Sequence, residues 1–249
     1  MRLMAILMAL LLTACASSSG NKSVYVDSNQ QDRAKIHAEL GSGYYQENQM
    51  QIALEEFTKA VTINPNYSSG FNGLAMTYAA IHEDVKAEES FKRALSLDAQ
   101  SSEAHNNFGS FLCSRGRIDE SIVHFQEAVK NPLYTTPFVA YMNAGYCSLR
   151  KPNIDNAERF FGLALQYQPL LHNASYQLAK IYYGRKQYDL AQNTMRNALA
   201  NNPDPDMLVL AVKVERQLGN KDAAIGYAYE LKRKYPDAPQ SQSLVLGAE

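Results

Sequence analysis

From Ala34 onward, the chain repeats a residue pattern every 34 positions, as the spacing of Gly41, Ala75 and Gly109 shows. If each copy is numbered from 1 to 34, positions 7, 8 and 11 lie on one face of a first helix, and positions 20, 24 and 27 on one face of a second. Small residues at positions 8 and 20 let the two helices approach closely, and the large residue at position 24 fills the space beside them. The residues at positions 8, 20 and 24 are Gly41, Ala53 and Phe57; Ala75, Ala87 and Phe91; Gly109, Ser121 and Phe125; Gly145, Ala157 and Phe161; and Ala179, Ala191 and Met195.

One helix pair cannot bury its apolar face alone, so the copies must stack on one another. The pattern resembles the tetratricopeptide repeat over residues 34–238. The resemblance implies an all-α, right-handed solenoid of six helix-turn-helix repeats with a concave side. The expected repeats are 34–67, 68–101, 102–135, 138–171, 172–204 and 205–238, with a two-residue insertion near Thr135. We expect residues 131–137, which include two prolines, to form a longer ordered loop, and residues 239–249 to be a C-terminal tail too short for a full capping helix.

The first fifteen residues have the layout of a secretion signal. Arg2 precedes an unbroken apolar run over residues 3–12, which is about half of the ~20 residues that a membrane span needs. Small residues then run directly into Cys15, an order that resembles the signal of bacterial lipoproteins. This resemblance implies a signal peptide over residues 1–14, a lipid on Cys15 and sorting to the outer membrane. We expect residues 15–33 to be the lipidated cysteine and a flexible tether. An ordinary signal peptide, or a buried helix with a chance cysteine, is the alternative.

Neither composition nor motifs indicate catalysis. The chain has 24 Lys and Arg against 25 Asp and Glu, so its net charge does not favour nucleic acid as a partner. The sequence contains no metal-binding motif, no motif of a catalytic nucleophile and no phosphate-binding loop. Carboxylates such as Glu55 and Glu56 are expected on exposed helix faces, and His37 and His105 share position 4, which favours a packing role. We predict no enzyme, no catalytic or metal site, no cofactor except the covalent lipid, and no small-molecule substrate.

Two cysteines fall in neighbouring repeats. Cys113 occupies position 12 of the third first helix, and Cys147 position 10 of the fourth, because of the insertion. Those helices lie side by side in a solenoid, and the periplasm is oxidising, so we expect the two thiols to pair. Two buried free thiols on separate faces are the alternative.

The concave side is the expected binding surface. In the repeat family, positions 2, 5, 9, 12 and 13 of each first helix line it. Tyrosine and methionine at these positions would give an apolar groove with hydroxyl groups, which suits a peptide or a helix. The predicted groove residues are Tyr45, Asn72, Met76, Asn106, Met142, Tyr146, Tyr176 and Tyr183. Some of these tyrosines could instead pack between repeats.

The match becomes more specific between the third and fourth repeats. The segments 105–117 (HNNFGSFLCSRGR), 131–134 (NPLY) and 143–147 (NAGYC) add to the Cys15 motif and the six repeats. Together they resemble the type IV pilus pilotin family, the pilus biogenesis and stability lipoproteins of Gram-negative bacteria. The resemblance implies that the partner is the type IV pilus secretin, that the chain is anchored by lipid to the periplasmic face of the outer membrane, and that it promotes secretin localisation and multimer assembly there.

A second interpretation fits the same features. A different periplasmic repeat lipoprotein, such as a scaffold for cell-wall hydrolases or a factor for outer-membrane protein assembly, would also carry a lipid signal and a groove. An enzyme is the third class, and it would need a polar cluster that the sequence does not contain.

Overall fold

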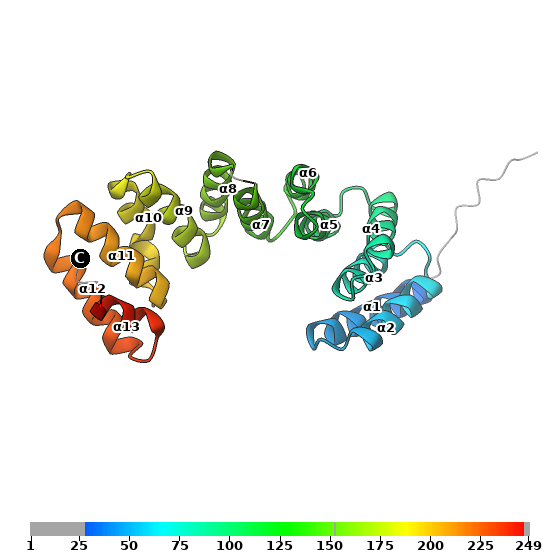
Figure 1. The fold of residues 1–249 in the computed structure, drawn as a ribbon. Helices are drawn as coiled ribbons and strands as arrows, with labels where there is room; N and C mark the ends of the chain where they lie inside the picture. The colour runs from blue at the N-terminus through cyan, green and yellow to red at the C-terminus, as the bar shows by residue number, and fades with distance from the viewer. Residues whose placement is uncertain (1–27, 152, 247–249) are drawn as a thin grey trace, which may run out of the picture.

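The structure is a computed structural model that describes residues 28–151 and 153–246. Within these ranges all regular structure is α-helical, and the helices follow one another as pairs in a curved row (Figure 1). The fold class is therefore confirmed as an all-α solenoid of helix pairs, whereas the predicted signal peptide and Cys15 lie outside the described residues. The pairs are α1 (Ser28–Gln46) with α2 (Met50–Ile63), α3 (Ser68–Ala80) with α4 (Asp84–Leu97), α5 (Ser102–Ser114) with α6 (Ile118–Ala128), α7 (Pro137–Arg150) with α8 (Ile154–Tyr167), α9 (His172–Gly184) with α10 (Tyr188–Ala200), and α11 (Pro205–Leu218) with α12 (Lys221–Lys234); α13 (Pro239–Leu246) follows.

The core lies between the helices of each pair and between neighbouring pairs. Phe57, Phe91 and Phe161 at position 24 are almost completely buried. Gly145 faces the ring of Phe161, and a Cβ atom there would lie 2.6 Å from that ring. Gly73 of the second repeat faces Phe57 of the first, and its Cβ would lie 2.0 Å from the ring. Glycine therefore permits backbone-to-ring contact both within a repeat and between repeats.

In five of the six helix pairs, the turn depends on one residue in the left-handed region, at position 15. A positive φ there reverses the chain after the first helix, so that the second helix can pack back on it. In the fourth repeat, position 15 is Pro152, which lies outside the described residues. The φ values are 60° at Asn48, 62° at His82, 81° at Gly116, 61° at Lys186 and 78° at Gly219.

Charged residues at position 14 join neighbouring repeats. Each reaches back to an acidic side chain in the first turn of the preceding second helix. Arg115 donates to Asp84 at 2.6 and 2.8 Å, and Lys151 contacts Asp119 at 2.9 Å. These pairs are largely exposed to solvent, so each stabilises the contact between neighbouring repeats only slightly.

The chain between α6 and α7 forms the longer ordered loop that the two prolines predict. The side chain of Tyr134 is 9% exposed and packs against Phe125 and Ala140. Asn131 organises the start of the loop, since its side-chain oxygen accepts from the Leu133 N–H at 2.9 Å.

The N-terminal end of the array differs from the expected boundary. The tether was expected to reach residue 33, but α1 already begins at Ser28. The extension is held because the Asn64 amide donates to the Gln31 side chain, across to the α2–α3 loop. At the other end, α13 packs on α11 and α12, and the hydroxyl of Ser241 donates to the Tyr235 carbonyl at 2.6 Å. Residues 239–246 thus form one short helix that packs on the last repeat. None of the described helices is both long enough and apolar enough to cross a bilayer.

Candidate functional site

The first helices of successive repeats form the inner row of the solenoid. α1 contacts α3, α3 contacts α5, α5 contacts α7, and α9 contacts α11. Helices that touch their counterparts in the next repeat form the tighter row, so the array curves toward them (Figure 1). The concave surface is therefore built from the first helices.

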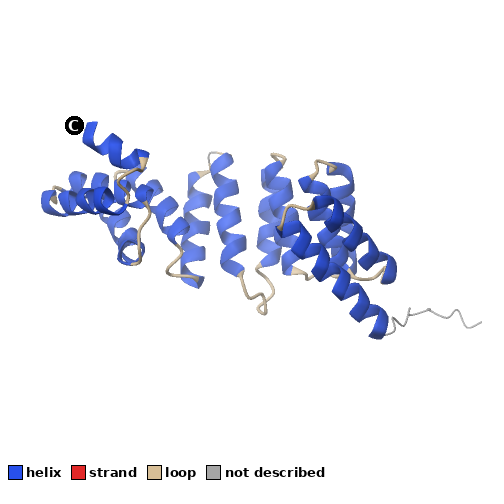
Figure 2. Ribbon diagram, turned by 90° about the horizontal axis from the view of Figure 1, so that it is seen from below, coloured by secondary structure: helices blue, strands red, loops and turns tan. Residues whose placement is uncertain are grey.

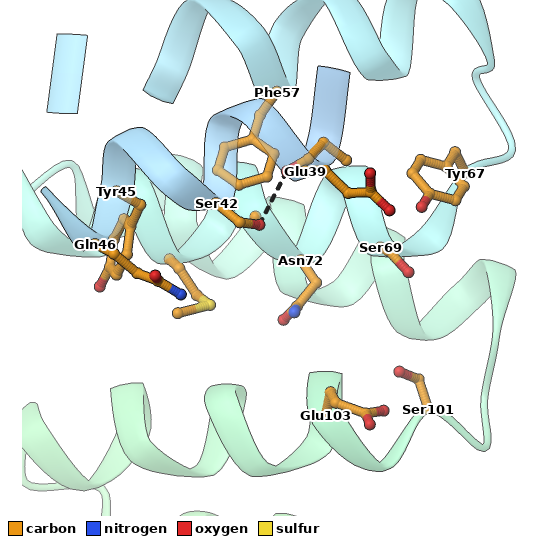
Figure 3. A pocket seen from close by; sticks show the side chains of 13 residues that line it. Glu39, Ser42, Tyr45, Gln46, Phe57, Tyr67, Ser69, Asn72, Ser101 and Glu103 are labelled. Atoms are coloured by element: carbon orange, nitrogen blue, oxygen red, sulfur yellow. Dashed lines mark hydrogen bonds between the residues drawn. The ribbon is translucent and has the colours of Figure 1, made fainter. Parts of the chain in front are cut away.

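A cavity of about 400 Å³ opens on this surface between the first and third repeats. Its apolar part contains Ala38, Phe57 and Met76, and side chains from α1, α3 and the start of α5 converge on it (Figure 3). Three predicted groove residues, Tyr45, Asn72 and Met76, line it. The complete lining is Ala38, Glu39, Ser42, Tyr45, Gln46, Phe57, Tyr67, Ser69, Asn72, Gly73, Met76, Ser101 and Glu103.

The cavity has an acidic character. Its lining includes the carboxylates of Glu39 and Glu103 and no basic side chain. Lys35 approaches Glu39 at 3.8 Å, but both side chains are largely exposed, so this pair neutralises the carboxylate only weakly. An apolar floor with carboxylates at the mouth favours a segment that has an apolar side chain next to a basic one.

A row of amides continues the concave surface toward the fourth repeat. The Asn107 amide donates to the Asn72 oxygen at 3.3 Å, and the Asn143 amide donates to the Asn106 oxygen at 3.0 Å. A weaker bond of 3.5 Å joins Asn106 to Asn107. The bonds connect α3, α5 and α7, and amides retain donors and acceptors that a bound main chain can use. Asn107 and Asn143 are not among the predicted groove residues. Both occupy position 6 of their repeats, and this shared asparagine is the sequence feature that could have identified them.

The other predicted groove residues lie deeper or farther along the array. Met142 is 8% exposed and packs with Phe161 and Leu178, so it belongs to the core between the fourth and fifth repeats instead of the surface. Tyr146 is half-exposed and stands edge-on to Phe161, with ring centroids 5.3 Å apart. The remaining pair, Tyr176 and Tyr183, pack against the core of the last two repeats. Only the part of the predicted groove around Tyr45, Asn72 and Met76 is brought together in one cavity.

Cys113 and Cys147 form a disulfide between α5 and α7, with Cα atoms 5.9 Å apart. The bond joins the third and fourth repeats across the long α6–α7 loop. The Arg150 guanidinium, at the end of α7, contacts the Cys113 carbonyl and adds a second link between these helices.

Positions 4 and 23 form an additional contact inside the first and third repeats, one that the repeat pattern does not predict. His37 and Glu56 meet at 2.6 Å in the first repeat, and the Nδ1 atoms of His105 and His124 lie 2.9 Å apart in the third. Hydrogen bonds from Lys59 and His37 hold the pKa of Glu56 below its usual range. Glu56 is therefore not the exposed carboxylate that was expected, because it is 8% exposed and paired.

The imidazole of His124 in the third repeat is neutral near pH 7. Burial, together with the neighbouring His105 side chain, lowers the pKa of His124 to about 4. The His124 ring also packs on Phe108, with centroids 4.4 Å apart. In the described part of the chain, no group of three or more His, Cys, Asp and Glu side chains is close enough to hold a metal ion.

Comparison with known proteins agrees with this architecture. Tetratricopeptide-repeat family models match residues 34–67 and 176–239. The chain is 26% identical to the type IV pilus assembly protein PilF of Pseudomonas aeruginosa over 244 residues, which cover 95% of this chain and 94% of PilF.

Two solved structures also superpose on this chain over most of its length. The crystal structure of PilW, described as a widely conserved type IV pilus biogenesis factor, superposes with a TM-score of 0.68 at 29% identity, over 85% of this chain and 98% of PilW. The structure of Pseudomonas aeruginosa PilF superposes with a TM-score of 0.74 at 24% identity, over 88% and 99% of the two chains. The chain has the fold of a tetratricopeptide-repeat solenoid, and these two relatives are described as a type IV pilus assembly protein and a type IV pilus biogenesis factor.

Proposed function

We propose that this chain is an outer-membrane lipoprotein that binds the type IV pilus secretin and promotes its localisation and multimer assembly. In this proposal the chain is a non-catalytic scaffold. The lipid on Cys15 holds it at the periplasmic face of the outer membrane, and the concave cavity binds a segment of a secretin subunit.

The observation that carries the proposal is similarity along nearly the whole chain to PilF, together with a cavity on the concave face. The match to PilF covers 95% of this chain, so it includes the N-terminal region as well as the repeats. A role in pilus biogenesis follows from the relatives, and the secretin as partner is the finer step that we add.

The mechanism is capture and concentration. An apolar side chain of the secretin segment would enter between Phe57 and Met76, and a basic side chain would meet Glu39 or Glu103. Binding to a scaffold that is tethered to the membrane turns later encounters between subunits into local ones, which raises their effective concentration.

The groove is tested with a pair of arginine substitutions. Asn72→Arg places a large cation on the cavity wall, whereas Val123→Arg places the same group on α6, where Val123 is 55% exposed. We expect Asn72→Arg to weaken binding of the purified secretin periplasmic domain by about tenfold or more, and Val123→Arg to leave it unchanged. Thermal denaturation checks that both variants fold. Equal affinity in the two variants would contradict binding in this cavity.

The anchor is tested separately in cells. Cys15→Ala should leave the repeats folded but mislocalise the secretin multimer, because the scaffold is no longer held at the membrane. Membrane fractionation and mass spectrometry of the mature protein provide the measurement. Normal outer-membrane multimers in this variant would reject the anchoring step while leaving groove binding open to the affinity test.

A further inference from the structure

Leu133 in the α6–α7 loop is exposed to solvent. Leu133 is 84% exposed, the highest value among the large apolar side chains in the described part of the chain. A single exposed leucine is ordinary on a protein surface. The loop around Leu133 is what makes it notable, because that loop is ordered on both sides of the side chain.

Hydrogen bonds and burial fix the direction of Leu133. Its N–H donates to the Asn131 side chain at 2.9 Å, and the Tyr134 N–H donates to the Asn131 carbonyl at 3.1 Å. The Tyr134 side chain is buried against Phe125, so the neighbouring Leu133 points away from the core. The loop therefore holds an apolar side chain in one position in solvent. An exposed apolar group held in this way is expected at a site that contacts an apolar partner.

The connection in the next repeat has the same character. Leu170 in the α8–α9 loop is 50% exposed, and Tyr167 at the end of α8 is 55% exposed. An aliphatic and an aromatic side chain together are the residue types that settle at the interface of a bilayer.

These loops share one edge of the solenoid with the start of α1. Each first helix begins, and each second helix ends, at the same edge, since the pairs are antiparallel. Figure 2 shows the loop between α6 and α7 projecting beyond the ends of the central helices, on the side to which the first residues of α1 also point. We call this side the loop edge; it comprises residues 129–136, residues 168–171 and the start of α1 at Ser28.

We propose that the loop edge rests on the membrane, with Leu133 and Leu170 inserted at the bilayer interface. The inference depends on the lipid anchor in the proposed function. Cys15 and Ser28 are thirteen positions apart. A segment of that length spans at most ~45 Å, so the lipid keeps the start of α1 within that distance of the membrane surface. Two isolated leucines bind a bilayer weakly, and the tether supplies the effective concentration that makes the contact persist.

The orientation has a consequence for the groove. The concave surface is formed by the sides of the first helices, whereas the loop edge is formed by their ends. If the ends stand on the membrane, the cavity near Met76 opens parallel to the membrane surface. A partner that is itself in the membrane can then enter from the side.

Tryptophan is the reporter for this orientation, because the chain contains none. Leu133→Trp gives a single tryptophan on the loop edge. Val85→Trp is the matched control, since Val85 is 73% exposed and lies at the start of α4, at the opposite ends of the helices. Leu170→Trp is a second reporter on the loop edge.

The anchor is made chemically so that the test does not depend on cellular lipidation. The mature chain, residues 15–249, is coupled through the Cys15 thiol to maleimide lipid in phosphatidylethanolamine–phosphatidylglycerol vesicles; the Cys113–Cys147 disulfide leaves Cys15 as the coupling site. Tryptophan emission is then recorded with and without brominated lipids, which quench a ring at the interface.

We expect the emission of the Leu133→Trp and Leu170→Trp proteins to shift to the blue on coupling and to be quenched by brominated lipid, while the Val85→Trp protein changes neither. No shift in any variant, or equal quenching in all three, would overturn the proposed orientation. A shift at residue 133 only when purified secretin is added would also overturn it, and would assign Leu133 to a protein contact. The other vesicle measurements contain no secretin, so a negative result there does not bear on secretin binding in the cavity. Equally, a loss of secretin binding would not bear on the orientation at the membrane.

Discussion

Reduction of the Cys113–Cys147 bond should destabilise the fold substantially, although the bond joins helices that already touch. The bond closes a loop with a sequence separation of 34 residues. Freeing a loop of this length raises the entropy of the unfolded chain, which lowers the free energy of unfolding by about 3.8 kcal/mol at 25 °C. For a chain of this size, that corresponds to a loss of roughly 8–15 °C in Tm.

The assay is urea unfolding followed by far-ultraviolet circular dichroism, with and without dithiothreitol. A chain of residues 16–249 is used, so that Cys15 contributes no thiol. The Cys113→Ser/Cys147→Ser double variant is the control, and reductant should not change its midpoint. A difference below about 1 kcal/mol between oxidised and reduced protein would refute the loop-entropy reasoning. Two free thiols in the unreduced mature protein would refute the bond itself.

Two further predictions concern packing and pH. Gly73→Ala should destabilise the protein by at least about 1–3 kcal/mol in urea unfolding, because its Cβ would lie 2.0 Å from the Phe57 ring; Gly43→Ala in open space should stabilise it by about 0.5–1 kcal/mol. Equal effects would contradict the assigned contact. The pKa of His124 is about 4 in the folded chain, below its ordinary value near 6.5. Only the unfolded chain therefore binds a proton here between these pH values, and stability should fall as pH drops through that window. His124→Phe copies Phe160 of the fourth repeat and should flatten the decline measured by thermal unfolding across pH 4–7; an unchanged slope would contradict it.

The periodic part of the fold was predictable from sequence because its residues act alike in every copy. A ring at position 24, as at Phe57 and Phe161, needs a small neighbour, and the sequence records both partners of that contact. Gly73 was not anticipated, since it packs on the preceding repeat and its partner lies outside its own copy.

The candidate site was less predictable than the fold. A position in a first helix fixes the face on which a residue lies, but not how deeply the next repeat covers it. Met142 and Tyr45 were therefore predicted alike, and only Tyr45 reaches the cavity. The extension of α1 to Ser28 also escaped prediction, because it depends on a contact between the side chains of Gln31 and Asn64, which belong to different helices or loops.

The left-handed turns between paired helices contain residues whose replacement by glycine would make the fold more stable. Asn48, His82 and Lys186 hold a positive φ that glycine adopts freely, and the left-handed backbone costs other residues about 1–2 kcal/mol, less for asparagine. Glycine at such a turn changes no residue that lines the concave cavity. The robustness of this scaffold can thus be raised or lowered one turn at a time, independently of what it recognises.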